Sequence, residues 1–204
     1  MSKTLLESLL PVSENITNKL QEHTIFYEDH NREMLAPNND SLYAALIPVP
    51  SILDEVNWWV GQNELVDKVI EVGGKFYDKV DYHTTLVYSK TAGSTLYEYL
   101  RDHSGIILES AEATFKDLAM FGTCCVMLLD APYLQTLNKK LTSIGATSDF
   151  PDYNPHITLF KLPDTISEDD KQWFKDWMDG QKLPTSTITY DNLNCAPLDE
   201  TWGD

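Results

Sequence analysis

The sequence is short of positive charge and of long apolar runs. It has 15 Lys and Arg residues against 32 Asp and Glu residues, a formal net charge of −17. Proteins that bind long nucleic acids neutralise many phosphates with a basic surface, so this balance excludes such a partner. It also disfavours an anionic membrane surface. No stretch approaches the roughly 18 apolar residues that span a bilayer, and the first residues lack a signal-peptide pattern. We therefore expect a soluble, cytoplasmic protein.

Cysteine is scarce as well. Cys124 and Cys125 are adjacent within an apolar run, and Cys195 stands alone. There is no C-x-x-C motif and no histidine at the spacing of a zinc ligand, so we predict no metal site and no cofactor. Three thiols in a reducing compartment are typical of buried, unreactive side chains.

The 204 residues favour one domain built of two small lobes. Residues 1–40 look like an N-terminal extension, and residues 41–204 form the main body. We place lobe 1 at about 41–105, lobe 2 at about 106–195 and a C-terminal tail at 196–204. The function of the extension is not readable from its residues.

The two lobes follow the same order of elements. A strand candidate, a helix and a second strand occur at 42–89 and again at 122–161. Ser51 is a candidate N-cap of the first helix, Gly145 a stop for the helix before it, and Ser167 the cap of a later amphipathic helix. Short, alternating, turn-bounded strands favour antiparallel pairing. The prediction is an α+β, bilobal fold with two pseudo-symmetric, mostly antiparallel sheets around a central cleft and helices outside.

The second strand of each lobe carries the same motif, His-x-Thr (HxT). The motif reads His83-Thr84-Thr85 in lobe 1 and His156-Ile157-Thr158 in lobe 2. Alternate residues of a strand share a face, so each strand presents one imidazole and one hydroxyl together. Two such strands facing each other suit metal-free cleavage of a phosphodiester. One histidine accepts a proton, the other donates one, and the threonines bind the phosphate oxygens.

A single HxT strand would be weak support, because most such histidines only make one structural hydrogen bond. The repetition of the motif in near-identical contexts, HTTL and HITL, carries the prediction. The other histidines, His23, His30 and His103, lie in polar segments, and we expect them at the surface.

Two HxT motifs, one per half, resemble the two-histidine (2H) phosphoesterase superfamily over about residues 41–195. Within it, the segments SLYAALI, HTTLVYS, NPHITL and LDETW look most similar to bacteriophage anti-CBASS nucleases, which degrade cyclic oligonucleotide signals of the host. The resemblance implies a metal-free enzyme in which His83, Thr85, His156 and Thr158 form the catalytic site. It also implies that Tyr43 stacks on a base, and that Glu200 and Trp202 belong to a C-terminal segment that closes over one.

Other aromatic and basic side chains receive less specific predictions. Trp58, Trp59, Trp173 and Trp177 are expected to pack between helices. Tyr88 lies five positions after His83 and would face away from it in a regular strand. Lys90 and Lys161 are expected at solvated strand ends.

The sequence thus predicts a phosphodiesterase that cleaves the 3′,5′ bonds of cyclic di- or trinucleotides and counteracts CBASS immunity. It would act as a monomer in the cytoplasm of the infected host, if the gene is carried by a phage. Two alternatives stay open. One is a 2H enzyme acting on RNA 2′,3′-cyclic phosphates or 2′,5′ linkages, and the other is a sponge that binds a cyclic nucleotide without cleaving it.

Overall fold

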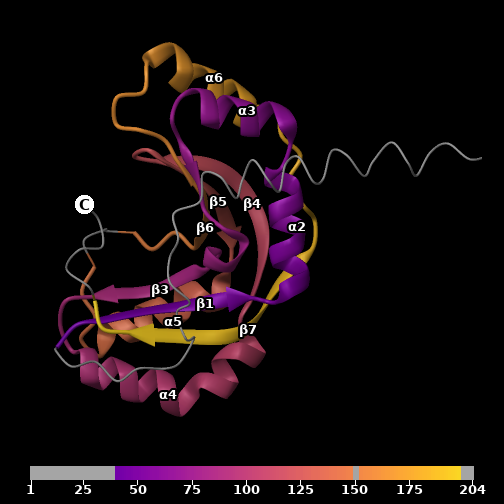
Figure 1. Ribbon diagram of the computed structural model, residues 1–204. Coiled ribbons are helices and arrows are strands. Elements are labelled where there is room, and N and C mark those ends of the chain that lie inside the picture. The colour runs from indigo at the N-terminus through magenta and orange to yellow at the C-terminus, as the bar shows by residue number, and fades with distance from the viewer. Residues whose placement is uncertain (1–39, 149–151, 199–204) are drawn as a thin grey trace, which may run out of the picture.

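The computed structural model describes residues 40–148 and 152–198, and in that part of the chain strands and helices alternate (Figure 1). The elements run in the order β1 (Leu42–Pro48), α2 (Pro50–Val60), α3 (Asn63–Glu71), β2 (Lys75–Phe76), the 3-10 turn η1 (Lys79–Asp81), β3 (Thr84–Ser89), α4 (Gly93–Ser110), β4 (Glu112–Phe121), β5 (Cys124–Asp130), α5 (Pro132–Ser143), β6 (His156–Lys161), α6 (Glu168–Asp179) and β7 (Thr187–Ala196).

The strands pair in the order β2-β6-β5-β4-β7-β1-β3, and each pair is antiparallel. The predicted α+β class and antiparallel pairing are therefore confirmed. The two predicted sheets are joined, because β7 pairs with β4 through its first residues and with β1 through the rest. The sheet is strongly curved (Figure 1), and β3 and β6 contact each other although they lie near opposite ends of the strand order.

One face of this sheet is covered by helices and forms the core. Strand residues such as Leu86 and Ile157 are fully buried there, together with apolar side chains of α4 and α5, among them Leu100 and Leu137. The residues that alternate with them on β3 and β6 are only partly buried. Burial of every second side chain is the pattern of a sheet with one covered face, so the HxT side chains lie on the other face.

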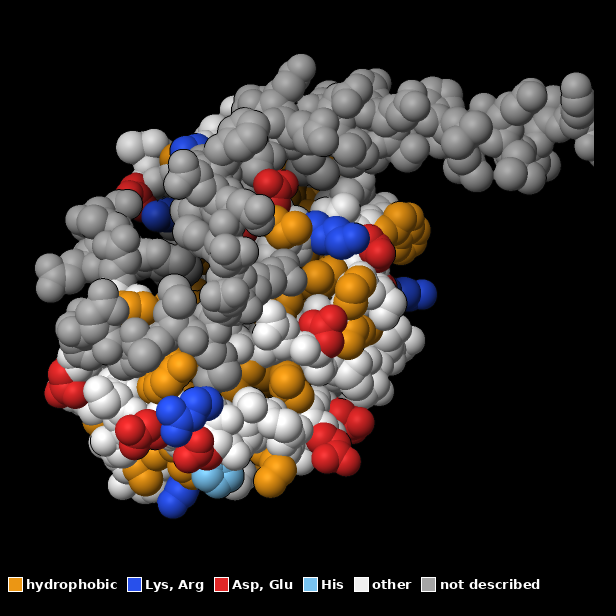
Figure 2. All heavy atoms as spheres, turned by 60° about the horizontal axis from the view of Figure 1, so that its bottom comes forward, with side chains coloured by type: hydrophobic (Ala, Val, Ile, Leu, Met, Phe, Trp, Pro, Cys, Tyr) orange, Lys and Arg blue, Asp and Glu red, His pale blue; other side chains and the backbone are white. Residues whose placement is uncertain are grey.

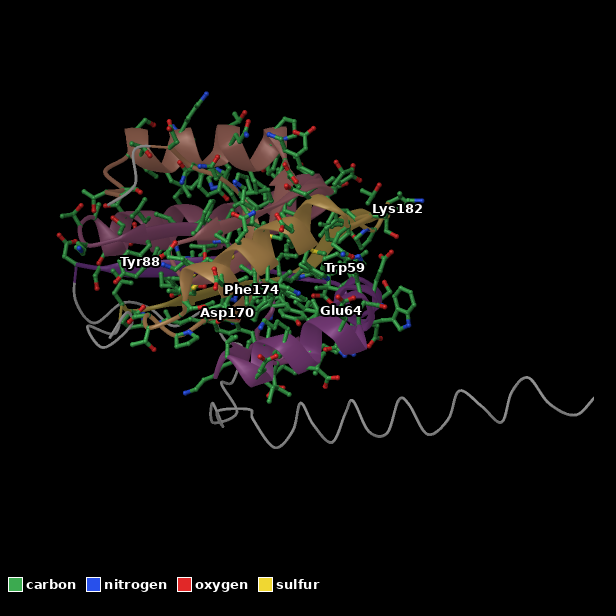
Figure 3. The ribbon with its side chains drawn as sticks, turned by 90° about the horizontal axis from the view of Figure 1, so that it is seen from above. Trp59, Glu64, Tyr88, Asp170, Phe174 and Lys182 are labelled. Atoms are coloured by element: carbon green, nitrogen blue, oxygen red, sulfur yellow. The ribbon has the colours of Figure 1, made fainter. Side chains whose placement is uncertain are left out.

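Helix α6 packs beside α2 and α3 at one end of the sheet (Figure 3). Asp170 of α6 forms an ion pair of 2.7 Å with Lys68 of α3, and the indole N–H of Trp59 donates a 2.9 Å hydrogen bond to the carbonyl of Lys182. Trp59 also contacts the ring of Trp177, as expected for helix packing. The same prediction is wrong for Trp58, which is 73% exposed, because it lies on the solvent side of α2.

The helix ends confirm two local predictions and correct a third. Ser167 accepts a hydrogen bond from the Asp170 amide at the start of α6, and Gly145 follows α5 with a positive φ of 114°. The first helix, however, starts at Pro50 with Val49 as its N-cap, so the prediction of Ser51 as the cap is wrong. Proline is well suited to the first turn of a helix because it has no N–H to leave unpaired. The helix therefore starts at Pro50, before the predicted cap.

Charges of both signs are interspersed on the face that carries α4 (Figure 2). Arg101, for example, forms an ion pair with Asp102, and the neighbouring His103 is exposed and stacks on Tyr99, as its predicted surface position requires. His23 and His30 lie outside the described residues. Within the described ranges, no helix is both long enough and apolar enough to cross a membrane.

Candidate functional site

The two HxT histidines make the same local hydrogen bond. Nδ1 of His83 lies 2.6 Å from the carbonyl oxygen of Asp81, and Nδ1 of His156 lies 2.7 Å from that of Asn154, in each case two residues earlier in the chain. A carbonyl oxygen can only accept, so Nδ1 carries the proton in both rings. Nε2 of each neutral ring is therefore left with its lone pair, which is the state that can accept a proton from a substrate.

The strand that carries each motif also contains the same irregularity. The register between β1 and β3 shifts directly after Thr85, so Leu86 is an extra residue in the pairing. The register between β5 and β6 shifts directly after Thr158, and Leu159 is the extra residue. Each register shift is a β-bulge, a feature that turns the following side chains and is common beside active sites. The duplication of the halves thus extends from the motif to its backbone distortion.

The bulges change which later residues share the face of the histidines. In β3 two consecutive residues after Thr85 are buried, and Tyr88 is then partly exposed and pairs directly with Tyr43. Directly paired residues of antiparallel strands point to the same side. The prediction that Tyr88 faces away from His83 is therefore wrong, because it assumed a regular strand. The bulge in β6 likewise places Lys161 on the same face as His156.

Aromatic side chains flank both imidazoles. The Tyr43 ring meets the His83 ring edge-on at 6.0 Å, and its hydroxyl lies 3.4 Å from the Thr85 hydroxyl. The Phe121 ring meets the His156 ring edge-on at 5.0 Å. Tyr43 thus lies beside the first histidine and threonine, and its stacking on a base stays a prediction. Burial raises the pKa of the Tyr43 phenol, which keeps its hydroxyl protonated.

The protonated, charged form of both histidines is disfavoured. Burial lowers the pKa of His83 from the ordinary value of 6.5, against the opposing effect of the Asp81 carbonyl, and a positive charge on His156 lowers this pKa further. Burial also lowers the pKa of His156, and its bond to Asn154 again opposes the shift. Since β3 and β6 also contact each other, this effect of His156 on His83 indicates that the two motifs lie near each other.

Positive charge lies on the same face as His156. Lys161 is exposed and pairs directly with Lys75 of β2 on one side and with Cys124 of β5 on the other. Its charge opposes the effect of burial on the Cys124 thiol, whose pKa is raised. Two ammonium groups thus lie on the same face of the sheet as His156, and positive charge there favours an anionic ligand.

One buried polar atom on this face lacks a partner. Asn194 of β7 pairs directly with Ala45, which in turn pairs with Thr85, so the three residues form a row across the sheet. Within the described part of the chain, the Oδ1 atom of Asn194 is buried and has no hydrogen-bond partner. An unpaired buried amide oxygen costs free energy until a donor reaches it. Sequence reasoning did not find Asn194 or Phe121, because neither belongs to a motif, and it placed Lys161 only at a solvated strand end.

The remaining predictions are only partly covered by the described residues. Glu200 and Trp202 lie outside them. Cys125 and Cys195 are buried, and burial raises the pKa of each thiol to about 12, while Cys124 is partly exposed. Among the described residues, no three His, Cys, Asp or Glu side chains are grouped as metal ligands.

Similar proteins are known from phages and from bacteria. The model of the family described as anti-CBASS protein Acb1 matches residues 67–202. Curated relatives with that name include one from Acinetobacter phage Ac42, 56% identical over 34 residues, and one from Enterobacteria phage T4, 34% identical over 74 residues. The matches cover 17% and 30% of this chain, and they span only 23% and 49% of the relatives' lengths.

Solved structures with a similar arrangement include Escherichia coli LigT in apo form, with a TM-score of 0.45 and 17% identity over 78% of this chain and 95% of LigT. Another is the protein TT0787 of Thermus thermophilus, with a TM-score of 0.46 and 15% identity over 76% and 83% of the two chains. The family model covers well over half of the sequence, including both HxT motifs. The chain therefore belongs to the anti-CBASS protein Acb1 family.

Proposed function

We propose that this protein is a metal-independent phosphodiesterase that cleaves the 3′,5′ bonds of cyclic di- or trinucleotides and so counteracts CBASS immunity. Its family and the paired HxT motifs support this proposal. The observation that carries most weight is the identical Nδ1-to-carbonyl hydrogen bond of both histidines, since it leaves two Nε2 atoms for proton transfer in one site.

In the proposed reaction the scissile phosphate lies between the two rings. A ribose 2′-hydroxyl, or a water molecule, attacks phosphorus and loses its proton to Nε2 of one histidine. The bond from phosphorus to the 5′-oxygen breaks, and the leaving oxygen takes a proton from the other histidine. The hydroxyls of Thr85 and Thr158 donate hydrogen bonds to the non-bridging oxygens, where negative charge builds up.

Burial favours His83 as the proton acceptor and His156 as the donor. His83 is the more deeply buried of the two rings, and two charged rings repel each other, so a single proton shared by the pair is better accommodated on His156. A bound phosphodiester carries negative charge and raises the pKa of both rings, which makes the singly protonated state accessible near neutral pH. His83, the neutral ring beside Tyr43, is then the base.

The test is a panel of cyclic di- and trinucleotides incubated with the protein in EDTA, with products identified by mass spectrometry. Linear products in EDTA support the proposal. If the protein cleaves 2′,3′-cyclic mononucleotides or 2′,5′-linked dimers but none of the cyclic di- and trinucleotides, the alternative 2H substrates are the correct assignment. Recovery of intact cyclic nucleotide from the denatured complex would identify a sponge, and restoration of activity by a divalent ion would contradict the metal-free mechanism.

A further inference from the structure

The outer edge of β3 is held by side chains of the second half instead of by another strand. Among the described strands β3 pairs only with β1. On its other side the amide of Asn138 on α5 donates a 2.9 Å hydrogen bond to the carbonyl of Leu86, and the hydroxyl of Tyr153 donates one of 2.9 Å to the carbonyl of Thr85. These are consecutive carbonyls at the bulge that follows the first motif.

The contact between the halves continues toward the end of β3. The amide of Thr147 donates a 2.9 Å hydrogen bond to the Ser89 hydroxyl, and the Lys90 amide donates one of 3.1 Å to the Thr147 hydroxyl. Thr91 donates to the carbonyl of Gly145. These bonds fix the end of the strand, whereas Tyr153 and Asn138 reach the carbonyls of Thr85 and Leu86 at the motif itself.

Tyr153 also lies close to the second motif along the chain. Asn154, the next residue, supplies the carbonyl that holds Nδ1 of His156, and the carbonyl of Pro155 accepts a 2.9 Å hydrogen bond from the Leu129 amide of β5. The segment is therefore fixed to the second half at one end and to Thr85 at the other. Burial raises the pKa of the Tyr153 phenol, so the hydroxyl keeps the proton that it donates.

We propose that Tyr153 and Asn138 are positioning residues that set the separation of the two HxT motifs by hydrogen-bonding the consecutive carbonyls of Thr85 and Leu86. The consequence for catalysis rests on the proposed function, because a phosphate must reach both Nε2 atoms at once. A displacement of about 1 Å between catalytic groups lowers rates by about a hundredfold. Neither residue touches the substrate in this scheme, so both act through the backbone of β3.

Tyr153→Phe removes the hydroxyl and leaves the ring in place. The matched control is Tyr190→Phe, since the Tyr190 hydroxyl on β7 lies 3.1 Å from the buried hydroxyl of Thr84, a side-chain group of the same strand β3, and reaches neither the Thr85 nor the Leu86 carbonyl. Both variants lose one buried hydrogen bond and should lose similar stability, about 1 kcal/mol. We expect Tyr153→Phe to lower kcat on a cyclic dinucleotide about tenfold or more at nearly unchanged KM. Tyr190→Phe should keep kcat within about threefold.

A second readout does not depend on turnover. In an NMR titration of the ligand-free protein, the pKa of His83 should rise in Tyr153→Phe relative to Tyr190→Phe, because separation of the halves weakens the effect of the His156 charge. Asn138→Ala should shift both readouts in the same direction and serves as the test if Tyr153→Phe does not fold. Equal kcat and equal His83 titration in the Tyr153 and Tyr190 variants would overturn the proposal. If the wild-type protein cleaves no cyclic nucleotide, the proposed function fails, and the titration still decides the positioning role.

Discussion

Replacement of either HxT histidine by glutamine is the most direct test of the acid–base pair. Glutamine keeps a polar side chain of similar length, but its amide neither takes up nor releases a proton near neutral pH, so it cannot act as a general acid or base. A positioned general acid or base contributes about 10²–10⁴ in rate, or about 2.7–5.5 kcal/mol of transition-state stabilisation. We therefore expect His83→Gln and His156→Gln each to lower kcat by a factor in this range, with KM changed far less.

The structure also limits what these substitutions can do to folding. Each histidine is only partly buried, and its ring is held by a hydrogen bond from Nδ1 to a carbonyl two residues earlier. Loss of such a bond costs about 0.5–1.5 kcal/mol. For a protein of this size, about 1 kcal/mol corresponds to a Tm shift of about 2–4 °C. Both variants should therefore unfold cooperatively and close to the temperature of the wild-type protein.

The assay combines initial rates on a cyclic dinucleotide with thermal unfolding of the same samples. Because both protons move around one phosphate, the double variant should be little slower than the slower single variant. Single variants that are folded and retain more than about a tenth of the wild-type rate would refute the acid–base roles. Losses that multiply in the double variant would show two independent contributions in place of one coupled pair.

Four further results are expected. The pKa values of His83 and His156 are both lowered, so kcat/KM should be highest below pH 6.5, as a pH–rate profile of the wild-type protein would show. A lowered folded-state pKa means that the unfolded chain binds protons first, so the free energy of unfolding should fall as pH drops below 6.5, and this slope should weaken in His83→Gln in urea titrations. Lys161→Met should raise KM about three- to tenfold in a salt-dependent manner, whereas Lys175→Met on the exposed side of α6 should not, as measured at two ionic strengths. Cys125, whose pKa is raised to about 12, should resist thiol reagents in the folded protein, which a colorimetric thiol assay would test.

Features with a local cause were predictable from the sequence. The HxT strands, the repeated order of strand, helix and strand, the cap at Ser167 and the stop at Gly145 all follow from alternation, capping chemistry or a positive φ. Each of these signals lies within about one element of the feature that it specifies.

Features that depend on distant contacts were not predictable. A bulge adds one residue without a composition signal, so the face of Tyr88 was predicted wrongly and that of Lys161 was not found. Tyr153 and Asn138 act on backbone carbonyls, which any residue at 85 and 86 would supply. The continuity of the two sheets depends on β7, whose pairing with both β4 and β1 is a property of the tertiary structure.

Both halves share the HxT motif, the Nδ1-to-carbonyl hydrogen bond and the bulge, so the side chains that differ between them are informative. Both rings have the same tautomer, so the tautomer does not decide which histidine holds the shared proton. An aromatic ring flanks each imidazole, so the halves differ in the polar groups nearby. The first half places the Tyr43 hydroxyl beside Thr85, and the second half places Lys161 on the face of His156. An aromatic ring with a hydroxyl suits a nucleobase, whereas an ammonium group suits a phosphate. The side chains that differ between the halves can thus give a duplicated scaffold one base-binding side and one phosphate-binding side.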